Sequence, residues 1–428
     1  MRERTGTFWA AWLGVIFLST IFLSGCWDRR EINELAFLSC FAADLEGERR
    51  IITSEIIRPA AVAGGGEGGG GGGTAASLPQ RNVIIGSESG DTFYAAGRRL
   101  AMRLPRRVYV AHTTAVLVGE EMARRGFKEV LDFLDRQHEH RRSTLILVTR
   151  GPAREVLIRA QGGLEATLGR EIAGLAKWVK VTGFGYIPTI HDVLVDLSGG
   201  AAATLIPVLE ISPQPLPPIL GAGSTGGAGS GGGSAQGASK IPEPQVAQTV
   251  RLNGAGLFHH DRLVGWLDPN QTRGWAWVKN QVKRALLELE APENQGKVSV
   301  EITEARGKAE VQTLNGQLQG AVKVKVEGNL LEQQGFYDFT REEAIRFIEN
   351  QMAAVIAQEI RSAILQAQKA GADVFDFGGA LSRKEPKLWK QVQTRWDEEF
   401  KKMPIGVEVE ARLRRTGLTG PPWRPKAR

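Results

Sequence analysis

The sequence contains one cysteine whose position suits covalent attachment of a lipid. Cys26 follows Leu23, Ser24 and Gly25, and this L-S-G-C pattern is a lipobox. The small side chains of Ser24 and Gly25 give a peptidase access to the backbone, and the thiol of Cys26 can form a thioether with a diacylglyceryl group. Because two or more acyl chains hold a protein stably on a membrane, we predict that Cys26 carries a lipid anchor.

Residues 1–25 have the three parts of an export signal. Arg2 and Arg4 supply positive charge, residues 8–23 are almost unbroken in their apolar character, and the lipobox closes the segment. The apolar stretch is shorter than the about 20 residues that a spanning helix needs, and polar sequence follows from Asp28. We therefore predict a signal peptide over 1–25; the alternative is an uncleaved anchor that ends in a cysteine.

The histidines do not have the spacing of a metal site. His138 and His140 flank Glu139, and side chains two residues apart on a helix point about 200° apart, so their rings do not converge on one ion. We expect this segment to be a solvated helix end. His112 lies in an apolar stretch and is expected to be a core histidine with satisfied hydrogen bonds.

Catalytic motifs are also missing from the sequence. No arrangement of nucleophile, base and orienting group stands out, and no pair of carboxylates suggests acid–base chemistry. Gly254 and Gly256 lack the third glycine and the helix of a dinucleotide-binding loop, and His259 and His260 follow them in a turn. We therefore predict no catalytic residues, no metal and no cofactor, and hence a protein that is not an enzyme.

Two groups of residues could contact a partner or a membrane. Arg98, Arg99 and Arg103 lie on one expected helix, in a chain with a formal net charge of +7. Such an excess favours anionic lipid or an acidic partner, whereas nucleic acid is not expected because no RNA- or DNA-binding motif accompanies the arginines. Trp275 and Trp277 could touch a partner or lipid headgroups, and packing in a core is the alternative that we favour.

The first part of the chain has the pattern of an α/β layer. The chain has 428 residues, 42% of them hydrophobic, enough for two or three domains with cores of their own. Segments with apolar residues at helical spacing alternate with runs of β-branched residues, and this alternation is typical of a sheet whose strands are at least partly parallel. Cys40 lies in an apolar run and is expected to be a small buried residue. Strands are expected over 51–57, 108–118, 144–148 and 205–211, and helices over 91–104, 120–137 and 152–159.

Two low-complexity tracts separate the patterned segments. Residues 64–73 hold nine glycines and one glutamate, and residues 213–247 begin rich in proline and continue rich in glycine, serine and alanine. We interpret the first tract as a loop and the second as either an interdomain linker or a long insertion. Accordingly, we expect an N-terminal domain over 26–212 and a C-terminal domain over 248–421.

The last part of the chain has an α+β pattern. Its expected elements are a hairpin around 259–262, strands over 298–303 and 321–327, a long helix over 341–370 with Gly371 as its cap, a helix over 386–401 and a closing strand over 405–413. The predicted fold class is therefore mixed and multidomain. An α/β layer is followed by an α+β domain in which a long helix packs against an antiparallel sheet.

A family resemblance begins at residues 25–36, which read G-C-W-D-x-x-E-I-x-x-L-A. They resemble the mature start of the Ger(x)C family, the lipoprotein C-subunits of nutrient germinant receptors in spore-forming bacteria. Further segments resemble the family in the same order, namely 56–59, 106–120, 131–142, 254–268 and 372–378. The resemblance implies two membrane-embedded partner subunits and a position on the outer face of the cytoplasmic membrane, in the spore inner membrane; it implies no catalytic mechanism.

Two other kinds of lipoprotein fit the sequence less well. A ligand-binding lipoprotein that feeds a transporter would have two similar α/β lobes around a polar cleft, whereas the two halves expected here are unlike. A cell-wall hydrolase would need catalytic residues, which we do not find. We therefore expect a subunit that acts by assembly, and the sequence leaves open which nutrient is sensed.

Overall fold

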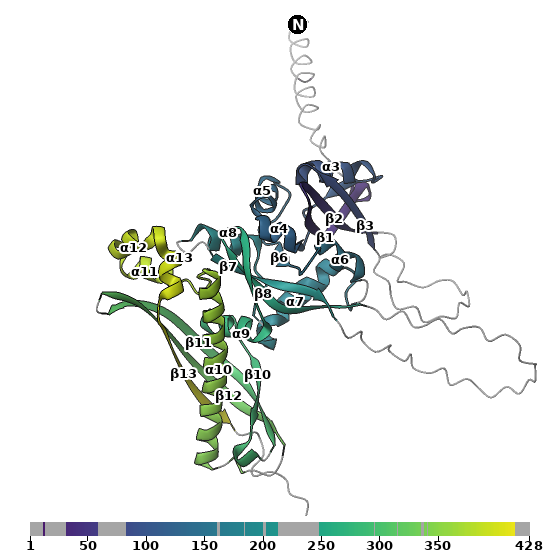
Figure 1. Cartoon of the computed structure of the whole chain (residues 1–428). Helices are drawn as coiled ribbons and strands as arrows, with labels where there is room; N and C mark the ends of the chain where they lie inside the picture. Colours follow the sequence, from purple (N-terminus) through teal and green to yellow (C-terminus); the bar gives the residue numbers. More distant parts are fainter. Residues whose placement is uncertain are drawn as a thin grey trace, which may run out of the picture.

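Two β-sheets with their helices make up the described part of the protein (Figure 1). The structure, a computed structural model, describes residues 12, 31–58, 83–160, 163–183, 185–199, 203–212, 248–294, 296–314, 316–334, 338–339 and 341–415. The predicted lipid site at Cys26 with Leu23, Ser24 and Gly25, and the tracts 64–73 and 213–247, lie outside these residues.

The first sheet has nine strands in the order β3-β2-β1-β5-β6-β7-β8-β9, with β4 (Arg107–Tyr109) paired to β1. Its central strands run parallel to one another: β1 (Leu35–Glu46), β5 (Ala115–Val118), β6 (Leu145–Val148) and β7 (Ala203–Ile211). Its outer strands run antiparallel to their neighbours: β2 (Arg49–Ile57), β3 (Val83–Gly90), β8 (Val250–His259) and β9 (Arg262–Leu267).

Helices bury both faces of this sheet. One face carries α3 (Phe93–Met102), α4 (Glu120–Arg125), α5 (Lys128–Arg136) and α8 (Ile190–Ser198), and the other carries α6 (Ala153–Arg159) and α7 (Leu168–Thr182). Along β1, Phe41 and Ala43 pack into the core on the face that carries α3, α4, α5 and α8. Cys40 and Ala42 pack into the core on the opposite face, which carries α6 and α7. Burial on both faces explains why this strand reads as an almost continuous apolar run, and it confirms that Cys40 is buried.

Two buried carboxylates from the sheet hold the starts of α6 and α7. The Asp44 carboxylate accepts hydrogen bonds from the backbone N–H groups of Ala153 (2.7 Å) and Arg154 (2.8 Å). The Glu55 carboxylate accepts one from the N–H of Leu168 (2.9 Å). The first N–H groups of a helix have no partner within it, and the helix dipole favours negative charge there. Burial nevertheless raises the pKa of Asp44, against the effect of these hydrogen bonds.

The second sheet has the strand order β10-β11-β12-β13 and packs against one long helix (Figure 1). Its strands are β10 (Ala285–Glu290), β11 (Lys297–Leu314), β12 (Gln317–Gln333) and β13 (Ile405–Arg415). The long helix α10 (Glu342–Ala370) ends at Gly371, whose φ of 71° is the left-handed value that caps a helix. The remaining elements are η1 (Ile32–Glu34), α9 (Pro269–Val278), η2 (Pro292–Asn294), α11 (Phe377–Lys384), α12 (Pro386–Val392), η3 (Gln393–Arg395) and α13 (Trp396–Lys402).

The predicted fold class is confirmed, and several details differ. The closing strand β13 pairs parallel to β12, so the second sheet is not antiparallel throughout. The expected helix over 120–137 divides at Gly126, whose φ is 125°, and the expected helix over 386–401 divides into α12, η3 and α13. The expected strand over 108–118 is likewise two strands, β4 and β5, which both pair with β1.

The first sheet also continues past the expected boundary at 248. β8 pairs antiparallel with β7, and Ile211 lies opposite Val250, so residues 213–247 connect two paired strands of one sheet. The strand pair expected at the start of the C-terminal domain therefore extends the N-terminal sheet. Leu257 and Leu267 from this pair are nonetheless buried in the core of the second sheet, which joins the two halves.

Candidate functional site

The arginines predicted to face a partner or a membrane lie exposed on α3. Two of them have contacts within their own domain: Arg99 donates a hydrogen bond to the Ser89 carbonyl (2.8 Å), and Arg103 forms an ion pair with Glu88 (2.6 Å). The Arg103 side chain remains 67% exposed. Arg98 is exposed as well, so α3 presents positive charge to its surroundings.

The two tryptophans predicted as possible partner contacts are buried instead. Trp275 is 3% exposed and Trp277 is fully buried, and both belong to the core around the second sheet. The indole N–H of Trp275 donates to the Val374 carbonyl, and that of Trp277 donates to Glu359, each at 2.9 Å. The structure therefore has the core packing that we favoured for both tryptophans, and the possible surface contact is wrong.

Glu359 is the centre of a buried polar network between α9 and α10. Its carboxylate pairs with the Arg273 guanidinium and accepts the indole N–H of Trp277, and its side chain is 8% exposed. The two helices cross closely at Gly274, where an added Cβ would lie only 2.3 Å from the Glu359 carbonyl oxygen. Every charge in this network has a partner, which is the requirement for burying an ion pair at acceptable cost.

The segment 372–378, which carried part of the family resemblance, is organised by a second buried carboxylate. Asp373 accepts hydrogen bonds from the backbone N–H groups of Phe377 (3.1 Å) and Gly378 (2.7 Å) and from the indole N–H of Trp396 (3.1 Å). Complete burial raises the pKa of Asp373 to about 7, although each hydrogen bond acts in the opposite direction. This motif therefore shapes the turn that starts α11 and holds α13 in place.

The histidines differ from expectation in opposite ways. His112, expected in the core, is exposed in the turn between β4 and β5 and packs beside the rings of Phe37 and Tyr109. His140, expected at a solvated helix end, has both ring nitrogens buried without a hydrogen-bond partner among the described residues. Its ring lies near Phe41 and Phe133, and burial lowers its pKa to about 4, so the ring is neutral at ordinary pH.

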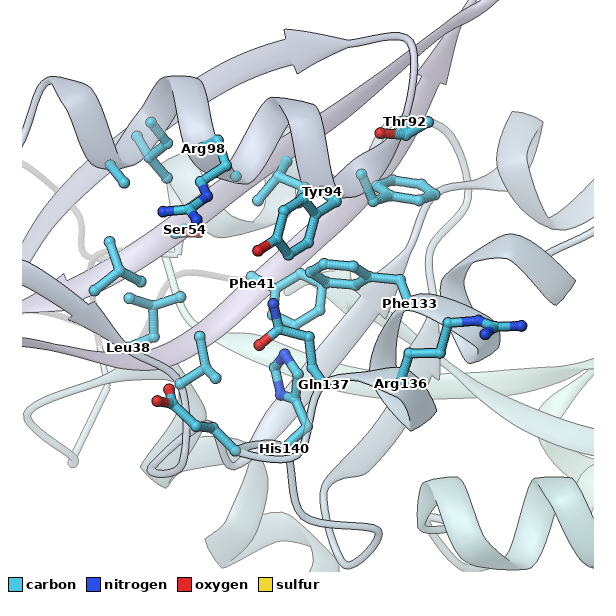
Figure 2. A pocket seen from close by; sticks show the side chains of 18 of the residues that line it. Leu38, Phe41, Ser54, Thr92, Tyr94, Arg98, Phe133, Arg136, Gln137 and His140 are labelled. Atoms are coloured by element: carbon cyan, nitrogen blue, oxygen red, sulfur yellow. The ribbon is translucent and has the colours of Figure 1, made fainter.

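His140 lines a cavity of about 1000 Å³ between α3, α5 and the strands β1 and β2 (Figure 2). The cavity walls are mostly apolar, with contributions from Leu38, Phe41, Ile52, Phe93, Leu100 and Phe133. Ser54 also lines it, and its buried hydroxyl has no hydrogen-bond partner among the described residues. At the edge, the Arg98 guanidinium lies 5.6 Å from the centre of the Tyr94 ring.

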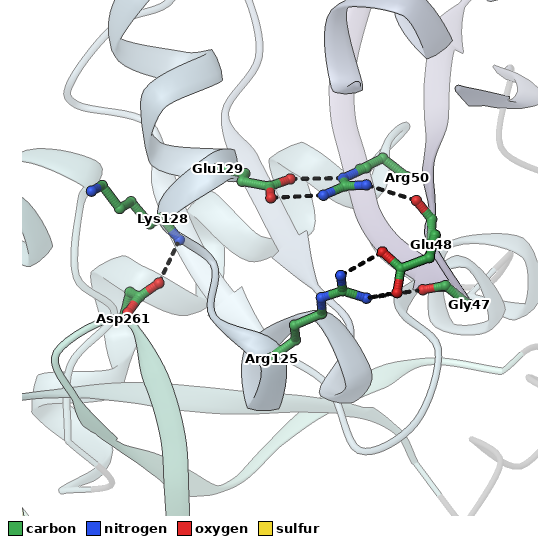
Figure 3. Close-up of polar contacts among 7 residues, drawn as sticks. All are labelled: Gly47, Glu48, Arg50, Arg125, Lys128, Glu129 and Asp261. Atoms are coloured by element: carbon green, nitrogen blue, oxygen red, sulfur yellow. Dashed lines mark hydrogen bonds and ion pairs between the residues drawn. The ribbon is translucent and has the colours of Figure 1, made fainter. Parts of the chain in front are cut away.

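Three of the four carboxylates around this cavity are paired with neighbouring arginines, and the fourth, Asp91, lines it together with the cationic Lys128. Glu129 accepts two hydrogen bonds from Arg50, both 2.7 Å long, and this contact lowers the pKa of Glu129 (Figure 3). Asp132 pairs with Arg136 at 2.8 Å. Glu139, a further residue of the cavity, pairs with Arg107 at 3.4 Å. These pairs leave the cavity without a surplus of negative charge.

The same arginine joins α4 and α5 to the turn between β1 and β2. Arg50 also donates to the Glu48 carbonyl (2.6 Å), and the Glu48 carboxylate binds Arg125 of α4 with hydrogen bonds of 2.5 and 2.7 Å (Figure 3). One wall of the cavity is thereby fixed to the sheet. No local sequence pattern indicates the cavity, because its lining comes from segments up to about a hundred residues apart.

The described residues contain no group of three or more histidine, cysteine, aspartate or glutamate side chains placed to hold a metal ion. No described helix is long and apolar enough to cross a membrane. The cavity and the exposed basic face of α3 are therefore the two features of the described chain that are suited to binding.

Two family models match the chain. A model described as "Spore germination protein N-terminal domain" matches residues 28–211, and one described as "Spore germination B3/ GerAC like, C-terminal" matches residues 253–417. The chain belongs to the Ger(x)C family. The two matches leave out only the start, the tract between the halves and the last residues.

Similar proteins and a solved structure agree with this assignment to the Ger(x)C family. Spore germination protein KC of Bacillus subtilis (strain 168) is 27% identical over 95% of this chain and 96% of that protein. Putative spore germination protein YfkR of the same organism is 27% identical over 91% of this chain and 92% of that protein. The crystal structure of the GerBC protein superposes with a TM-score of 0.52 over 87% of this chain and 96% of its own, at 17% identity, which shows a shared fold.

Proposed function

We propose that this chain is the lipid-anchored C-subunit of a spore nutrient germinant receptor, which acts by assembling with two membrane-embedded subunits. The observation that carries the proposal is the match of both family models in order, together with relatives named as spore germination proteins that are similar over nearly their whole length. None of these names is that of an enzyme. The chemistry assigned to the chain is accordingly lipid attachment at Cys26, with no reaction of its own.

The lipobox supports the membrane location. Cys26 lies only a few residues before η1 and β1, so a lipid on its thiol would keep the first sheet close to the outer face of the cytoplasmic membrane, in the spore inner membrane. A tether of this kind raises the effective concentration of the chain at the surface and turns docking into an encounter between confined partners.

The basic face of α3 supports a contact at that surface. Arg98, Arg99 and Arg103 are exposed, and Met102 beside them is 80% exposed. A basic residue next to an anionic leaflet contributes about 1 kcal/mol of attraction, and acidic loops of a partner subunit would attract the same arginines. An exposed apolar side chain among cations suits either surface.

The anchor is tested with Cys26→Ala. We expect this variant to lose incorporation of radioactive fatty acid, and spores that carry it to stop responding to their nutrient while still germinating when the receptor is bypassed. Undiminished label would contradict the lipid site, and a normal nutrient response without label would contradict the role of the tether.

The surface contact is tested by changing Arg98, Arg99 and Arg103 together to Gln. Recovery of the membrane subunits in a pull-down should fall while the circular dichroism spectrum of the chain stays unchanged. A matched control changes Arg346, Arg383 and Arg395, three exposed arginines of the other half, to Gln. Equal recovery with both triple variants would remove the α3 face from the assembly.

A further inference from the structure

We propose that the cavity beneath α3 is a binding site for a small apolar carboxylate of the fatty-acid class. The cavity volume of about 1000 Å³ lies at the upper end of the range for small-molecule sites, about 300–1,000 Å³. The proposal goes beyond the germination role and does not depend on it, because binding is measured on the purified chain.

The walls define the body of the ligand. Large aliphatic and aromatic side chains from β1, β2, α3 and α5 line the space, and the cavity is bounded by two helices that pack on the same face of the sheet (Figure 2). Removing apolar surface from water is worth roughly 25 cal/mol per Å², so a hydrocarbon chain is the body that gains most here. A strongly polar ligand such as a sugar would find too few partners.

The buried polar atoms that lack partners among the described residues define the other end of the ligand. The Ser54 hydroxyl is buried with no partner among the described residues, and an unmade hydrogen bond of this kind is costly in a native protein. Among the same residues the buried nitrogens of His140 have no partner either, and a neutral imidazole offers one N–H donor. Both groups can donate to the same kind of atom, an acceptor oxygen, and they line the same cavity.

The charged side chains at the edge of the cavity favour an acceptor that is an anion. The glutamates and Asp132 described above are already paired with arginines, and the charge of Asp91 is balanced by that of Lys128 in the same lining. Arg98 and Arg106 line the cavity with no carboxylate partner in the described part of the chain. The surplus is therefore positive. A carboxylate satisfies the donors and the surplus together, which a neutral alcohol or a cationic amine does not.

The test uses a fluorescent fatty acid, 11-(dansylamino)undecanoate, with the purified chain from residue 27 onward, which contains every strand and helix labelled in Figure 1. The probe should bind saturably, and laurate should displace it at least about tenfold more effectively than dodecanol or dodecylammonium, a difference that corresponds to about 1.4 kcal/mol. Absence of saturable binding, or equal displacement by all three competitors, would overturn the proposal.

Gly97 offers a way to fill the cavity from within α3. A Cβ at this position would meet only the Cδ1 atom of Ile52, at 3.8 Å, so Gly97→Leu extends a side chain into the open space. Leucine also favours a helix more than glycine does. We expect Gly97→Leu to weaken probe binding at least about tenfold. The matched control is Gly174→Leu in α7, where a Cβ would have no neighbour within 4 Å, and there binding should be unchanged.

A second variant keeps the test independent of cavity filling. Arg98→Gln alters an exposed side chain at the edge, and it should reduce the preference for laurate over dodecanol while leaving dodecanol displacement unchanged. Binding by Gly97→Leu equal to that of the parent would place the probe elsewhere and overturn the site. An unchanged laurate preference in Arg98→Gln would overturn the assignment of a carboxylate.

Discussion

The core around the second sheet and the cavity beneath α3 treat buried polar groups in opposite ways. Around the second sheet, Glu359 and Asp373 are buried with several hydrogen-bond donors each. Beneath α3, Ser54 and His140 are buried with none among the described residues, and they lie beside open space. A satisfied network specifies how elements pack, whereas an unsatisfied group beside a cavity marks a place where a ligand can supply the missing partner.

The largest expected effect is the loss of the buried ion pair. Arg273→Met removes the partner of Glu359 and leaves its charge buried, which typically costs about 3–5 kcal/mol. Urea unfolding at pH 7 should show this decrease in the free energy of unfolding. The matched control is Arg346→Met, whose pair with Glu342 is exposed on both sides and should be worth less than about 1 kcal/mol. Similar losses in both variants would refute the satisfied-network interpretation.

A pH dependence in the same half should follow from Asp373. Its pKa is about 7 in the folded chain and 3.8 as the ordinary value, so the folded state holds more protons between these values. Stability should therefore fall as pH rises from about 4 to 7, by up to about 1.4 kcal/mol per pH unit. Asp373→Asn should remove this fall in urea unfolding measured at pH 5 and 7.5. Asp376→Asn, at a more exposed carboxylate, should keep it.

His140, beside the cavity, should contribute a pH dependence of the opposite direction. The pKa of His140 is about 4 in the folded chain and 6.5 as the ordinary value, so the folded state holds fewer protons between these values. Stability should decrease as pH falls from 6.5 to 4, by about 2–3 kcal/mol in all. His140→Phe packs between the same aromatic rings without a proton to bind. A thermal denaturation series in which the variant loses as much stability as the parent on acidification would contradict this.

The smallest expected effect is the difference in the free energy of unfolding between alanine variants of two buried serines. Ser54→Ala removes a hydroxyl that has no hydrogen-bond partner in the described part of the chain and should change the free energy of unfolding by less than about 0.5 kcal/mol. Ser39→Ala removes a hydroxyl that donates to Thr167 at 2.7 Å and should cost about 1 kcal/mol. Guanidinium unfolding of both variants measures the difference. An equal cost would mean that Ser54 has a hydrogen bond after all.

Much of the fold could be predicted because its signals are local. The long helix α10 has apolar residues at helical spacing and a glycine cap, and it ends where the sequence indicated. β1 was missed, because a strand buried on both faces shows no alternation and its first residues resemble a lead-in. α7 and α8 were missed between short glycine-containing stretches. The parallel pairing of β13 was missed too, since a local pattern does not reveal the direction of a neighbour.

The site was predicted less well than the fold. Tryptophan has an apolar body and a polar N–H, so Trp275 suited a core better than a surface, but a surface contact stayed possible until its neighbours were known. His140 lies past the end of α5, and its ring packs beside Phe41 of β1, which lies about a hundred residues earlier in the sequence. A cavity is a property of elements that are distant along the chain, and no single segment encodes it.

The place of β13 in the second sheet has a consequence for biosynthesis. β10, β11, β12 and α10 leave the ribosome before β13 does, yet β13 pairs with β12 along most of its length. Pairing between strands so far apart in sequence is slow to form. The sheet of the C-terminal half is therefore completed only after residues 405–415 have been translated.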